Sequence, residues 1–108
     1  VTQSRWFLND DQISQLTNHL ADRLFAEFPV QQSDRLHSLF LRLFATKPTL
    51  KEHRFVSEFL AHQEGFFKAD QNPEWQKKLK AQPEAAGKQA LAALAQVLMA
   101  SNRFLYID

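Results

Sequence analysis

The sequence predicts an all-α fold, a small antiparallel bundle of about four main helices. An irregular excursion is expected before the last helix, and a short extended tail at the C-terminus. Three observations carry the prediction. Apolar residues recur at helical spacing along most of the chain, capping motifs precede several of these stretches, and no two strand-like stretches lie near each other. A chain of 108 residues suits one domain, residues 1–108.

The first helix is predicted to begin after Asn9. Asn9 can cap the helix, and Gln12 stands three residues later, as in a capping box. Acidic residues in the first turn suit the helix dipole. The apolar stripe then follows at helical spacing, and Pro29 ends the helix. The stripe comprises Ile13, Leu16, Leu20, Leu24, Phe25 and Phe28.

The second helix is predicted to start near Ser33 or Asp34 and to stop before Pro48. Its stripe is Leu36, Leu39, Phe40, Leu43 and Phe44. Arg35 and Arg42 share one face and are expected to hold carboxylates on neighbouring helices, in preference to binding a ligand.

The third helix has the clearest start, because Thr49 and Glu52 form a capping-box pair directly after Pro48. Phe55, Val56, Phe59 and Leu60 form its expected buried face. Gly65 is a plausible C-terminal stop. The short connection predicts that the second and third helices are antiparallel neighbours.

Residues 66–83 form the least regular stretch, and a mobile excursion or an insertion is expected there. Within it, Asn72 and Pro73 resemble a helix cap followed by an N1 proline, so one or two helical turns are predicted. Trp75 and Leu79 could attach this short helix to the body of the domain. The nearby lysines are interpreted as a solvated face rather than a polymer-binding surface. They are Lys77, Lys78 and Lys80.

The last helix is predicted to begin near Pro83 or Glu84, with Gly87 weakening its first turns and Asn102 as its C-cap. Residues 90–108 are the most hydrophobic segment, so the other helices are expected to pack around this helix. The tail, residues 104–107, is predicted to be extended.

Composition excludes several function classes. The net charge of +1 argues against nucleic-acid binding by bulk charge. Without cysteine, the chain has no disulfide, thiolate zinc site, iron–sulfur cluster or covalently attached haem of its own. No apolar run is long enough to predict a membrane span. The chain begins without an initiator Met and shows no signal peptide, so we interpret it as a processed product or a piece of a longer protein.

No catalytic, cofactor-binding or metal-ligating set is predicted. No two of the four histidines have the i, i+4 spacing that favours a helical metal site. Glu58 with His62, and His19 with Asp22, are better explained as pairs on helix surfaces. The Ser and Thr residues are mostly placed for capping, and there is neither a nucleophile elbow nor a glycine-rich phosphate loop.

The aromatic residues leave one alternative open. Either they fill the core, or some of them form an interface with the rest of a larger protein. The candidate interface residues are Trp6, Phe7, Trp75, Phe104 and Tyr106. Phe66 and Phe67 belong to the same surplus of rings.

Several stretches resemble the C-terminal conserved domain of unknown function of planctomycete-type cytochrome c proteins. The similar stretches are residues 2–9, residues 35–44 with Pro48, Thr49 and Glu52, residues 94–98, Ser101 with Asn102, and residues 104–108. The chain departs from the family pattern at Thr46 and Lys47, where the family has Gly-Arg, and at Ala100 and Arg103.

The resemblance implies a large exported, extracytoplasmic (for example periplasmic) protein with haem c carried elsewhere in the chain and this piece at its C-terminus. It implies no catalytic residues here. The predicted function is therefore a non-catalytic structural or interaction module whose partners are other domains of the same protein. The alternative is a composite enzyme or metal site that those domains complete. The sequence does not set the oligomeric state.

Overall fold

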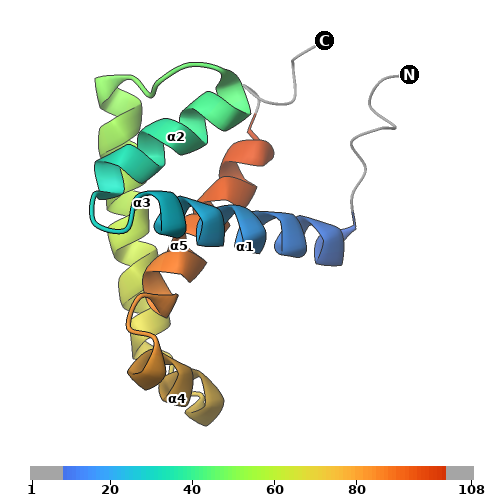
Figure 1. Cartoon of the computed structure of the whole chain (residues 1–108), viewed down its shortest axis with the longest axis vertical. Helices are drawn as coiled ribbons and strands as arrows, with labels where there is room; N and C mark the ends of the chain where they lie inside the picture. Colours follow the sequence, from blue (N-terminus) through green and yellow to red (C-terminus); the bar gives the residue numbers. More distant parts are fainter. Residues whose placement is uncertain (1–8, 102–108) are drawn as a thin grey trace.

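The computed structural model describes residues 9–101, and that part of the chain is all-helical, as predicted. It contains α1 (Asp10–Glu27), α2 (Gln32–Phe44), α3 (Leu50–Ala69), α4 (Pro73–Ala81) and α5 (Ala85–Met99), with no strand among the described residues (Figure 1). The predicted extended tail and the Asn102 cap lie outside the described residues.

Helix α5 is the centre of the fold, as its hydrophobicity predicted. Its main contacts are with α1 and α3, and most of its first eleven residues are buried. Many of these are alanines, whose small side chains let neighbouring helices approach closely. The buried residues are Ala85, Ala86, Ala90, Leu91, Ala92, Leu94 and Ala95.

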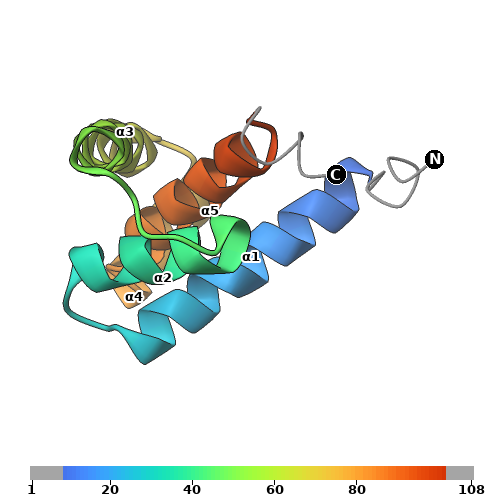
Figure 2. The ribbon, with the colours of Figure 1, turned by 90° about the horizontal axis from the view of Figure 1, so that it is seen from above.

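Helix α3 runs antiparallel to α5, whereas α1 and α2 cross α3 steeply. In Figure 1, α3 descends and α5 returns upward, so these two are antiparallel, while α1 crosses them steeply. Seen from above, α1 and α5 lie beside each other and run in opposite senses (Figure 2). Helix α2 crosses α3 steeply in both views and has more contacts with α1 and α5. The prediction that α2 and α3 are antiparallel neighbours is therefore wrong, because the apolar face of α2 packs toward α1 and α5.

The predicted capping boxes are both confirmed. Asn9 Oδ1 accepts from the Gln12 backbone N–H at 2.8 Å, and Gln12 Oε1 accepts from the Asn9 N–H at 3.0 Å. Thr49 Oγ1 accepts from the Glu52 N–H at 3.1 Å, and Glu52 Oε1 accepts in return at 2.9 Å. Each pair satisfies two N–H groups that have no partner within the helix.

Helix α3 does not stop at Gly65. It continues to Ala69, and Gly65 keeps helical backbone angles without a positive φ. Glycine in a helix interior costs about 1 kcal/mol relative to alanine, which packing on either side can offset. Both Val56 before Gly65 and Phe67 after it pack in the core. The sharp left-handed turn falls instead at Ala45, φ 60°, which ends α2.

The stretch 66–83 is more regular than predicted. Its first residues complete α3, and nine residues form α4, so only the short connections around them are not helical. The prediction that Asn72 and Pro73 start a helix is confirmed. The continuation of α3 places Phe67 beside Trp75 of α4.

Candidate functional site

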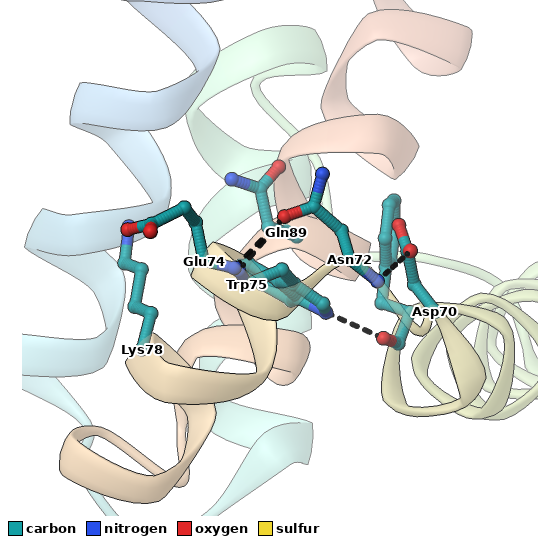
Figure 3. Close-up of a pocket in the computed structure, with 7 residues that line it drawn as sticks. Asp70, Asn72, Glu74, Trp75, Lys78 and Gln89 are labelled. Atoms are coloured by element: carbon teal, nitrogen blue, oxygen red, sulfur yellow. Dashed lines mark hydrogen bonds between the residues drawn. The ribbon is translucent and has the colours of Figure 1, made fainter.

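The candidate site lies at the junction of α3 and α4, where Trp75 is the predicted interface residue that the structure describes (Figure 3). Asn72 Oδ1 accepts from the backbone N–H groups of Glu74, at 3.0 Å, and Trp75, at 3.2 Å. The Asp70 carboxylate in turn accepts from the Asn72 N–H at 3.0 Å. This relay orients the first turn of α4 and therefore the Trp75 side chain.

Trp75 holds α4 against α3, as expected. Its indole Nε1 donates to the Phe67 carbonyl at 2.6 Å (Figure 3). The Trp75 and Phe67 rings meet edge to face with centroids 6.3 Å apart, and Phe66 and Phe67 meet similarly at 5.9 Å. Edge-to-face contacts of this kind contribute about 0.5–1.5 kcal/mol beyond burial. The three rings therefore form one ordered group, the aromatic cluster of Phe66, Phe67 and Trp75.

An open hollow of about 380 Å³ adjoins this cluster. Aromatic carbon lines much of it, and polar side chains stand at its rim (Figure 3). The Lys78 ammonium lies 6.0 Å from the Trp75 ring centroid, within the range of a weak cation–π interaction. The lining residues are Phe67, Asp70, Asn72, Glu74, Trp75, Lys78 and Gln89. Such a surface can receive an apolar side chain and hydrogen-bond the groups around it.

Phe66 is the most exposed ring of the cluster, with 67% of its surface accessible. Phe55, 62% exposed, lies eleven residues earlier (66 − 55 = 11) on the same helix. Eleven residues are close to three helical turns, so the two rings share one side of α3. Exposed Glu58 and His62 lie between them on that side, so the two rings are separate apolar groups. The expected burial of Phe55 is wrong.

The two arginines of α2 behave differently. Arg42 donates from Nη2 to both carboxylate oxygens of Glu27, at 2.9 and 3.0 Å, which confirms the predicted carboxylate partner. Arg35 donates from Nη1 to the Phe28 carbonyl at 2.6 Å, and its guanidinium lies 3.9 Å from the Phe25 ring centroid. For Arg35 the expected ion pair is replaced by a backbone carbonyl and a ring, because the side chain is partly buried between α1 and α5.

Burial lowers the pKa of the Arg35 guanidinium below its ordinary value, while the nearby Glu64 carboxylate acts in the opposite direction. Arg35 also lines a smaller hollow of about 210 Å³ with Phe25, Glu64 and Gly87. Its role in the described fold is to hold the end of α1 against α2.

The histidines include one pair that the sequence did not predict. Glu58 and His62 lie on an exposed part of α3, and the described residues contain no group of three or more metal-ligating side chains. Instead, His37 of α2 meets His53 of α3, with ring centroids 5.8 Å apart. Sequence reasoning missed this pair because its members lie on different helices and have no periodic spacing. Lys77, Lys78 and Lys80 are exposed, as expected for a solvated face.

The other predicted interface residues, Trp6, Phe7, Phe104 and Tyr106, lie outside the described residues. No helix within residues 9–101 is long and apolar enough to cross a membrane. Comparison with protein-family models, curated proteins and solved structures finds no match to this chain.

Proposed function

We propose that this chain is a non-catalytic helical interaction module at the C-terminus of a large exported, planctomycete-type cytochrome c-associated protein. It binds other domains of that protein through the aromatic cluster of Phe66, Phe67 and Trp75. The family assignment and the extracytoplasmic location rest on the sequence motifs described above. The binding surface rests on the geometry of α3 and α4.

The observation that carries the binding surface is the exposed Phe66 ring, which packs on Phe67, a residue that lines the hollow at Trp75. Phe66 is 67% exposed although it packs edge to face against a partly buried neighbour. An ordered ring that stays in water forgoes hydrophobic stabilisation, and contiguous apolar surface of this kind marks protein-binding sites. Aromatic side chains next to a hollow are also typical of the residues that dominate binding energy.

The polar groups around the hollow support recognition rather than bond-making. The Asp70 carboxylate and the Asn72 amide already accept backbone N–H groups that begin α4. The indole N–H is likewise engaged with a backbone carbonyl of α3. These groups serve to position the rings, so the surface offers a rigid apolar anchor with a polar rim.

The test compares two substitutions at exposed apolar residues of α3. Phe66→Ser removes the proposed anchor, and Leu50→Ser removes a side chain that is 89% exposed at the opposite end of the helix. The upstream remainder of the reading frame is purified separately, and its affinity for each variant is measured by calorimetry. Phe66→Ser is expected to weaken binding at least about tenfold, since anchor residues contribute about 2 kcal/mol. Leu50→Ser should bind like the unsubstituted chain.

Two results would contradict the proposal. One is the absence of binding by the unsubstituted chain, and the other is equal binding by both variants. The parent architecture is tested separately by the complete reading frame, in which an export signal and a C-x-x-C-H motif are expected upstream. A complete reading frame without a C-x-x-C-H motif would refute the cytochrome association. It would not bear on the binding surface, which the calorimetry tests.

A further inference from the structure

We infer that His37 and His53 form a two-imidazole binding site for a divalent transition-metal ion of the Zn²⁺, Cu²⁺ and Ni²⁺ group. The site lies between α2 and α3, away from the aromatic cluster, and it goes beyond the proposed function. The two rings meet edge to face, with centroids 5.8 Å apart and an interplanar angle of 66°.

The separation of the rings suits a shared ion. Zinc–imidazole bonds are about 2.0–2.1 Å long, so two imidazoles on one tetrahedral ion have ring centroids about 5 Å apart. The observed 5.8 Å is close to that value. For binding, we expect the side-chain torsions to turn one nitrogen of each ring toward the ion. Imidazole is the nitrogen ligand that these three metals share.

Hydroxyl groups already orient His53. Its Nε2 lies 3.3 Å from Ser33 Oγ on α2, and its Nδ1 lies 3.5 Å from Ser57 Oγ on α3. Metal-bound histidines in proteins are commonly held by a partner on the second ring nitrogen, which sets the tautomer and the ring direction. Ser57 can keep that role while the Ser33 hydroxyl gives way to the ion.

Both rings are also partly shielded from solvent. His37 and His53 are half-buried, whereas His19 and His62 are exposed on helix surfaces. Partial burial restricts the rotamers of the two ligands, so less conformational freedom is lost when an ion binds. Water, or a side chain of another domain, completes the coordination sphere at the open side.

The position of the pair gives metal binding a structural consequence. Helices α2 and α3 cross with few contacts between them, and the left-handed Ala45 begins their connection. An ion held by one ligand from each helix links the two where packing is sparse. Since the pair exists only in the folded chain, binding stabilises the fold by mass action.

The experiment titrates the untagged, chelator-treated chain with Zn²⁺ and Ni²⁺ by calorimetry, and records melting curves with and without each ion. One ion per chain is expected, together with a rise of several degrees in melting temperature that EDTA reverses. His37→Ala and His53→Ala should each weaken binding at least tenfold. The matched controls His19→Ala and His62→Ala should retain it.

Circular dichroism of every variant checks that the helices persist, and His53→Gln replaces His53→Ala if the latter does not fold. The inference is overturned if the unsubstituted chain shows no saturable binding. It is equally overturned if His37→Ala binds as tightly as the controls, or if His62→Ala abolishes binding. The calorimetric test of the aromatic cluster contains no metal, so either proposal can fail without the other.

Discussion

Replacing Gly65 with alanine should stabilise the protein, because α3 runs unbroken through this residue. A Cβ built at Gly65 meets nothing within 4 Å, and its backbone angles suit an L-residue. The substitution therefore adds no clash and removes the entropic cost of glycine in a helix interior. The expected gain is about 0.5–1 kcal/mol in free energy of unfolding. For a domain of 108 residues that corresponds to a rise of roughly 2–4 °C in melting temperature.

Gly87→Ala is the matched control, since it makes the same change in α5. There the added carbon lies 3.2 Å from Phe25 Cζ, and the Phe25 ring is held on another side by the Arg35 guanidinium. The ring must shift to admit the methyl group, which offsets the helical gain. We expect the Gly87 variant to gain at least about 0.5 kcal/mol less than the Gly65 variant. Urea unfolding followed by circular dichroism measures both. A destabilised Gly65→Ala would refute the continuous α3.

Three other substitutions test the fold. Leu94 of α5 is 0% exposed, so Leu94→Ala should lower the free energy of unfolding, measured in urea, by about 2–5 kcal/mol. A loss below about 1 kcal/mol would refute the central place of α5. Thr49→Ala should cost about 1 kcal/mol through the lost cap, whereas Thr49→Ser should recover most of it. Arg42→Gln should lower the free energy of unfolding by at most about 1 kcal/mol, because the side chains of Arg42 and Glu27 are both more than one-third exposed. High salt should reduce this loss, and a loss that salt leaves unchanged would exclude the ion pair as its cause.

The helix starts could be predicted because they depend on local chemistry. The capping boxes at Asn9 and Thr49, and the cap at Asn72, each act within four residues, so the sequence contains all the necessary information. The central place of α5 was equally visible, since its alanines and leucines follow one another too densely for a surface helix.

Non-local features were harder to predict. From the sequence alone, Gly65 resembles a helix C-terminus. The helix continues past it because tertiary contacts such as the packing of Phe67 stabilise the next turn. The carbonyl partner of Arg35 depends on how α1 ends against α2. The meeting of His37 and His53 depends on the crossing of two helices, which no periodicity encodes. The place of Trp75 in the first turns of α4 could be predicted because the Asn72 cap is local, whereas its part in an interface stays a prediction.

Hydrogen exchange of the amides in residues 64–78 tests the proposed binding surface most directly. It compares the isolated chain with the same residues in the complete parent protein. We expect slower exchange there in the complete protein, centred on the end of α3 and the start of α4. The buried amides of α5 should change little, because packing within this domain already protects them. Unchanged exchange in residues 64–78, or new protection confined to other helices, would contradict the assignment of Phe66, Phe67 and Trp75 as the binding surface.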